Sequence, residues 1–97
     1  MANSHDSLMR LSVEAYLLAR ECGRIAGIIP SVQERFSDGQ ISVLSEELSF
    51  FHSRMLLVGG YLAGFVTVEE DIDLASEKKY MESCRSLLTV LNSVLEA

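Results

Sequence analysis

The sequence is poor in cysteine, in basic residues and in long apolar runs. Its two cysteines, Cys22 and Cys84, are too few for a metal site of their own or for a disulfide-stapled secreted domain. Eight Lys and Arg stand against fourteen Asp and Glu, which gives a net charge of −6. The longest uncharged stretch, residues 55–68, is shorter than the ~18 residues that span a bilayer. We therefore expect no nucleic-acid partner, which would require a basic surface, and no membrane span.

Motifs of known chemistry are also missing. The sequence contains no G-x-S-x-G, H-E-x-x-H or P-loop pattern. Its acidic residues Glu69, Glu70, Asp71 and Asp73 lack the alternating spacing and the glycine of a calcium loop. His52 adjoins a predicted core position, and we interpret it as a residue at the edge of the core. We expect no catalytic residue, no cofactor, no metal and no enzymatic activity.

The chain is expected to fold as one domain, 1–97. Its 97 residues are too few for two independent cores, and 48% of them are hydrophobic, as in globular proteins. Residues 1–6 are polar and are interpreted as a mobile arm, without the basic start and apolar run of a signal peptide. These features predict a cytoplasmic protein.

Apolar residues spaced three and four apart are abundant, which is typical of helices packed against helices. One series extends from Leu8 to Phe36, a second from Ile41 to Phe65, and a third from Met81 to Leu95. A proline cannot donate a backbone hydrogen bond, so the first helix is expected to be kinked or broken near Pro30. The fold class that we predict is all-α, a small antiparallel helical bundle of three main helices.

Glycine and capping residues suggest where the helices begin and end. Residues 37–40 are the expected first loop, with Gly39 in the left-handed conformation that closes a helix. Residues 67–70 fit a capping box that starts the third helix. The sequence does not decide whether Gly59 and Gly60 break the second helix. The pairs Gly23/Gly27 and Gly60/Gly64 favour close packing of neighbouring helices.

The first two predicted helices carry more apolar side chains than a lone three-helix bundle can bury. We assign the surplus to partner binding, at Met9, Val13, Tyr16, Leu17, Val43, Phe50, Leu57 and Tyr61. Large apolar patches left in water typically mark interaction sites. The sequence thus predicts a small acidic interaction module, chaperone-like, adaptor or inhibitor, that binds a protein partner, itself as a homodimer, or both.

The alternative interpretation is a small all-helical dimeric enzyme with an anion site at its interface. Arg10, Arg20 and Arg24 of the first helix are the cations that such a site would use. The only lysines, Lys78 and Lys79, lie close to the acidic residues of the predicted third helix. Because so few cations are available, we favour the interaction module.

Overall fold

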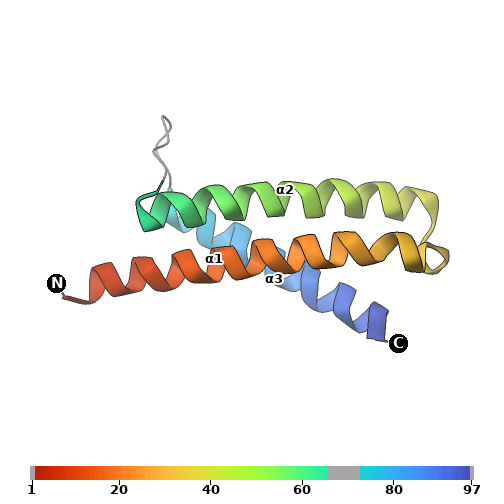
Figure 1. Ribbon diagram of the computed structural model, residues 1–97, viewed down its shortest axis with the longest axis horizontal. Helices are drawn as coiled ribbons and strands as arrows, with labels where there is room; N and C mark the ends of the chain where they lie inside the picture. Colours follow the sequence, from red (N-terminus) through yellow and green to blue (C-terminus); the bar gives the residue numbers. More distant parts are fainter. Residues whose placement is uncertain (1, 66–72, 97) are drawn as a thin grey trace.

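Three long helices make up the fold in the computed structural model, which describes the backbone of residues 2–65 and 73–96 and side chains from residue 7 onward in those ranges. Their order is α1 (Ala2–Ile28), a short 3-10 helix η1 (Ile29–Arg35), α2 (Asp38–Ala63) and α3 (Leu74–Glu96). Helices α1 and α2 lie antiparallel, and α3 crosses this hairpin diagonally (Figure 1). The predicted all-α bundle of three main helices is confirmed, and the described residues contain no strand.

The first helix breaks at Pro30, as predicted. Helix α1 ends at Ile28, and Pro30 occupies the first turn of η1, where a missing N–H costs least. Val32 leaves the helical region, with φ −127° and ψ 23°. Ile29 is nevertheless buried, and Phe36 is partly buried against the same core. The chain therefore turns toward α2 while its apolar side chains stay on the inner face.

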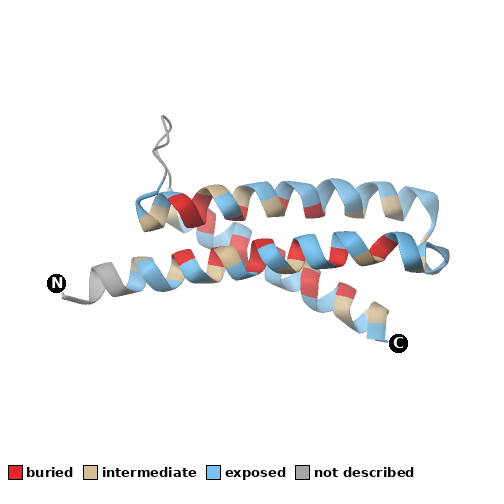
Figure 2. Cartoon of the chain, in the orientation of Figure 1, coloured by how far each residue is buried: buried red, intermediate tan, exposed pale blue. Residues whose placement is uncertain are grey.

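The core lies between the three helices, and buried residues follow their facing sides (Figure 2). Its buried apolar members are Ala15, Leu18, Ala19, Cys22, Ile25, Ile29, Leu48, Phe51, Met55, Val58, Met81, Cys84, Leu88 and Leu91. Two polar side chains, Ser12 and Glu77, are buried with them. The Ser12 hydroxyl donates to the Gly59 carbonyl oxygen at 2.7 Å, which ties α1 to α2.

The predicted role of Gly39 is wrong, because a capping box starts α2 earlier than expected. The Gln40 amide donates to Ser37 Oγ at 3.2 Å, and the Ser37 amide donates to Gln40 Oε1 at 2.9 Å. This reciprocal pair satisfies free amides of the first turn. Gly39 therefore lies inside α2, and the only described glycine with positive φ is Gly64.

The ends of the other helices also differ from the sequence-based expectation. Helix α1 begins at Ala2, so its backbone includes most of the segment that was interpreted as an arm. No proline or glycine precedes Ser7, so no helix-breaking residue prevents α1 from extending toward the N-terminus. Helix α3 begins after Asp73, whose carboxylate accepts from the Ala75 amide at 3.1 Å. The capping box predicted at residues 67–70 falls outside the described residues.

Helix α2 continues through Gly59 and Gly60, which answers the question that the sequence left open. A Cβ atom at Gly59, which belongs to neither predicted pair, would lie 3.1 Å from ring carbons of Tyr16, so this glycine permits a close approach of α1 and α2. A Cβ atom at Gly27, in contrast, would have no neighbour within 4 Å. Gly64 ends α2 with φ 82°, a conformation that favours glycine.

Alanine substitutions at these glycines are predicted to have opposite effects. Gly64→Ala should lower the free energy of unfolding by about 1 kcal/mol, because an L side chain is strained at positive φ. Gly27→Ala should raise it by up to about 1 kcal/mol, because α1 gains helix propensity at an open position. Urea denaturation of both variants checks this pair, and a loss at Gly27 as large as that at Gly64 would contradict it.

Candidate interaction surfaces

Three apolar side chains project from α1 away from the core. Met9, Val13 and Leu17 are spaced four residues apart and are all exposed, Val13 to 54%. Side chains at this spacing share one face of a helix. We call these three residues the α1 stripe; none of them lines a groove that we describe below. The α1 stripe contains three of the eight residues that the sequence assigned to partner binding.

Tyr16 lies apart from the α1 stripe. It is partly buried, and its ring packs over Gly59 of α2. Tyr16 therefore contributes to the contact between α1 and α2. An aspartate at this position would damage that contact as well as any external one, so Tyr16 is a poor probe of partner binding.

Two of the four predicted binding residues of α2, Val43 and Phe50, lie on its flank beside α3. The Phe50 ring has its centroid 5.8 Å from that of Tyr80 in α3 and 5.4 Å from that of Phe51. Phe50 is still 49% exposed, so the aromatic contact covers only part of its ring. The other two differ in exposure, since Tyr61 is exposed and Leu57 is partly buried. The structure thus brings Val43 and Phe50 to a boundary between two helices.

A groove of about 540 Å³ separates the first turns of α2 from the second half of α3. It is lined by Phe36, Ser37, Gly39, Gln40, Val43, Leu44, Leu87, Val90, Leu91 and Val94. A neighbouring hollow of about 420 Å³ lies later in α2 and earlier in α3. It is lined by Glu46, Glu47, Phe50, Phe51, Tyr80 and Ser83. We call the two together the α2–α3 groove. Its walls come from α2 and α3, with Phe36 and Ser37 at one end.

Sequence reasoning missed the α3 half of this groove. Val90 is 61% exposed and Tyr80 is 40% exposed. Val90 lies between core positions Leu88 and Leu91, and the spacing pattern of α3 gives no reason to single it out. Phe65, at 81%, and Leu56 are further exposed apolar residues that were not assigned to binding. Their exposure depends on how α3 crosses the hairpin and on where α2 ends.

A partly buried ion pair fixes the start of α3 against α2. Arg54 Nε donates to Glu77 Oε2 at 3.1 Å, and a second, shorter contact joins Arg54 Nη2 to Glu77 Oε1. The Arg54 guanidinium also lies 5.9 Å from the centre of the Tyr80 ring. Glu77 is only 2% exposed. This pair holds the wall of the groove that carries Tyr80.

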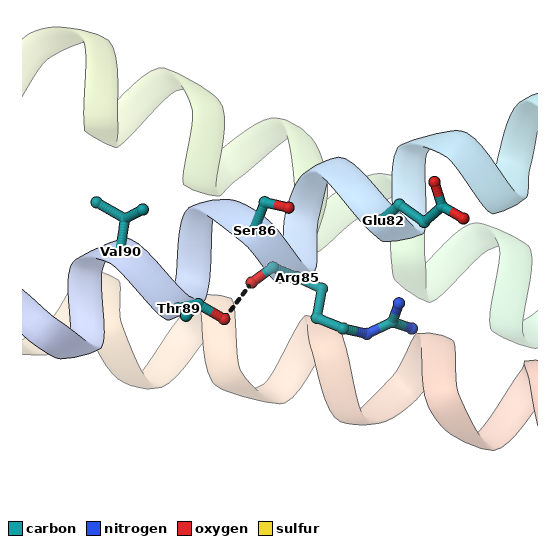
Figure 3. A pocket seen from close by; sticks show the side chains of 5 residues that line it. All are labelled: Glu82, Arg85, Ser86, Thr89 and Val90. Carbon is teal, nitrogen blue, oxygen red and sulfur yellow. Dashed lines mark hydrogen bonds between the residues drawn. The ribbon is translucent and has the colours of Figure 1, made fainter.

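The outer face of α3 carries an open pocket of about 550 Å³ that is lined by Glu82, Arg85, Ser86, Thr89 and Val90 (Figure 3). All five side chains come from this single helix. The Arg85 guanidinium forms an ion pair with Glu14 of α1, and Thr89 Oγ1 donates to the Arg85 carbonyl oxygen at 2.9 Å. Arg85 and Thr89 therefore already have partners, and the ion pair between Arg85 and Glu14 contributes to the packing of α3 on α1.

The cations proposed for an anion site are exposed on α1. Arg24 forms an ion pair with Glu21 at 2.9 Å and donates to Asn92 Oδ1 of α3 at 2.9 Å. The Arg24 hydrogen bond holds the pKa of the Glu21 carboxyl below its usual value. His52 lies beside Gly23, with ring atoms 3.7 Å from the position of a Cβ atom there. His52 is partly buried between α1 and α2, in keeping with our interpretation of it.

Within the described ranges, no three His, Cys, Asp or Glu side chains come together as a metal site would require. Among the helices that the structure describes, none is both long and apolar enough to cross a bilayer. No protein-family model, curated protein or solved structure matched this chain. The surfaces described above are therefore the basis for assigning a function.

Proposed function

We propose that this chain is a protein-binding module whose α2–α3 groove receives an amphipathic helix of another protein. The observation that carries the proposal is the open apolar groove, to which α2 contributes Val43 and Phe50 and α3 contributes Val90. By covering a helix of its partner in the cytoplasm, the module would act as a chaperone, an adaptor or an inhibitor.

The dimensions of the α2–α3 groove suit a helical ligand. Its lining residues extend along α2 from Gly39 to Phe51. At 1.5 Å per residue this is about 18 Å, or roughly three turns of a helix. An amphipathic helix presents apolar side chains at intervals of three and four residues, and such a ridge fits a groove between two helices.

Charge favours a partner helix with basic flanks. Glu46 and Glu47 line the groove on the α2 side and are both exposed. Within the described residues neither forms an ion pair, whereas Arg54 and Arg85 are already paired with Glu77 and Glu14. Lys or Arg residues beside the partner's apolar ridge would complement these carboxylates and speed association.

A second copy of the chain fits this groove less well, because each copy has a net charge of −6 and brings the same acids to the contact. The α1 stripe remains a separate proposed contact, which lies outside the groove and is available to a second copy of the chain. Met9, Val13 and Leu17 are all exposed, so packing in the core of this fold does not account for apolar residues at these positions.

Binding of synthetic helical peptides tests the groove. We expect a labelled amphipathic peptide of Leu and Lys, about 14 residues long, to bind the protein, and a matched peptide of Leu and Glu to bind weakly or not at all. Val43→Asp and Val90→Asp should each weaken binding by about tenfold or more, because each places an unpaired charge in an apolar contact. Fluorescence anisotropy measures the affinities.

Val13→Asp is the matched control, since it places the same charge on the α1 stripe, and its affinity for the Lys peptide should be unchanged. Circular dichroism checks that each variant keeps its helices. Equal affinity of the wild type and the two groove variants would overturn the proposal. If sedimentation instead shows that the wild type is a dimer and that Val43→Asp is a monomer, the groove is assigned to a second copy of the chain.

A further inference from the structure

Cys22 of α1 and Cys84 of α3 face each other where the two helices cross. Their Sγ atoms are 3.5 Å apart, although 62 residues separate them in the chain. Both are free thiols and both are fully buried. A disulfide requires about 2.05 Å between the sulfur atoms, so an approach of roughly 1.5 Å would allow the bond to form.

The two thiols differ in their tendency to ionise. The hydrogen bond from Cys84 holds the pKa of the Cys22 thiol below its ordinary value. The same bond and burial raise the pKa of Cys84. When Cys22 ionises, the proton that remains on Cys84 can be donated to the Cys22 sulfur across the same contact. Because the thiolate is the reactive form, the lowered pKa favours Cys22 as the nucleophile, with Cys84 as the thiol that then attacks the oxidised Cys22.

We propose that Cys22 and Cys84 form an oxidative modification site, at which a hydroperoxide converts the two thiols into a disulfide that joins α1 to α3. The Cys22 thiolate attacks one peroxide oxygen, the O–O bond breaks, and hydroxide or alkoxide leaves with a proton as water or alcohol. The resulting Cys22 sulfenic acid is attacked by Cys84, whose proton leaves with the hydroxyl group as water. The two thiols lose two electrons in total, and the peroxide gains them.

A hollow lies beside the crossing of α1 and α3, although neither cysteine lines it. The hollow, of about 190 Å³, is lined by Leu11 and Glu14 of α1 and by Lys78, Met81, Glu82 and Arg85 of α3. Met81 and Arg85 flank Cys84 on its own helix, so a small local opening of α3 would expose the pair to this hollow. This site is independent of what the α2–α3 groove binds.

Intact-mass measurement of the folded chain tests the proposal. Treatment with hydrogen peroxide should lower the mass by about 2 Da with loss of both free thiols, and dithiothreitol should reverse the change. Proteolysis should yield one cross-linked peptide that contains Cys22 and Cys84. The melting temperature of the oxidised chain should rise by on the order of 10 °C, because the bond closes a long loop.

The single-cysteine variants distinguish the two roles. In Cys84→Ser we expect dimedone to trap a sulfenic acid at Cys22, whereas in Cys22→Ser the remaining thiol should react more slowly by at least about tenfold. The wild-type result decides the proposal even where a variant is poorly folded. The proposal is overturned if the wild-type chain keeps both thiols under a peroxide treatment that oxidises an unstructured cysteine peptide. A disulfide-linked dimer in place of the internal bond would also overturn it.

Discussion

Replacing Phe51 with alanine is expected to lower the free energy of unfolding by about 3 to 5 kcal/mol, a large part of the stability of a domain of this size. Phe51 is 9% exposed and belongs to the core, and its ring edge also supports Phe50. Truncation removes a buried aromatic ring and leaves a cavity between α2 and α3. Urea denaturation monitored by circular dichroism measures the loss.

The neighbouring Phe50 provides a matched control. Its ring is about half exposed and contacts the rings of Phe51 and Tyr80 at its edge. Phe50→Ala should therefore cost only about 1 kcal/mol. Equal losses for the two variants would show that α2 is rotated relative to the position described here, and both the core and the groove would have to be reassigned.

Replacing Arg54 with methionine is expected to cost about 3 kcal/mol. The substitution leaves the Glu77 carboxylate buried at 2% exposure without the guanidinium that it binds. An uncompensated buried charge is strongly destabilising; we take the lower end of the usual range because Arg54 is itself 30% exposed. Urea denaturation near neutral pH gives the value.

The double variant Arg54→Met, Glu77→Leu separates the loss of the ion pair from the isolation of the carboxylate. Replacing a buried ion pair by apolar side chains of similar size is often neutral. We therefore expect the double variant to recover most of the stability that Arg54→Met loses. A double variant as unstable as the single one would mean that Arg54 acts mainly through its contact with the Tyr80 ring.

The spacing of apolar residues predicted which side of each helix is buried. Leu48, Phe51, Met55 and Val58 of the second series are all in the core. Phe65 ends the same series but is 81% exposed, because α2 stops at Gly64, and the chain leaves the helix there. The spacing of apolar residues along a helix does not indicate where a residue with positive φ, here Gly64, will end that helix.

The α2–α3 groove could not be predicted from periodicity, since it depends on the angle at which α3 crosses the hairpin. The sequence identified Val43 and Phe50 as surplus apolar residues, and their exposure agrees with that prediction. It did not indicate that Val90 and Tyr80 would face them across a groove. The contact between Cys22 and Cys84 depends on the same crossing.

Glu77 illustrates a second limit of sequence reasoning. It lies four residues before Met81, in phase with the core positions of α3, where a charged residue normally interrupts an apolar series. Only its contact with Arg54, on a different helix, explains how a carboxylate can be buried there. Pairs of this kind link residues far apart in the chain, and a single sequence provides no means of matching them.

Chemical-shift mapping is the most direct test of the claim that the α2–α3 groove binds a basic amphipathic helix. Backbone amide spectra of the labelled protein are recorded while the Leu and Lys peptide is added. The account predicts shift changes concentrated at Val43, Glu47, Phe50 and Val90, with Met9, Val13 and Leu17 unchanged. Changes confined to α1, or the absence of any saturable change, would contradict it.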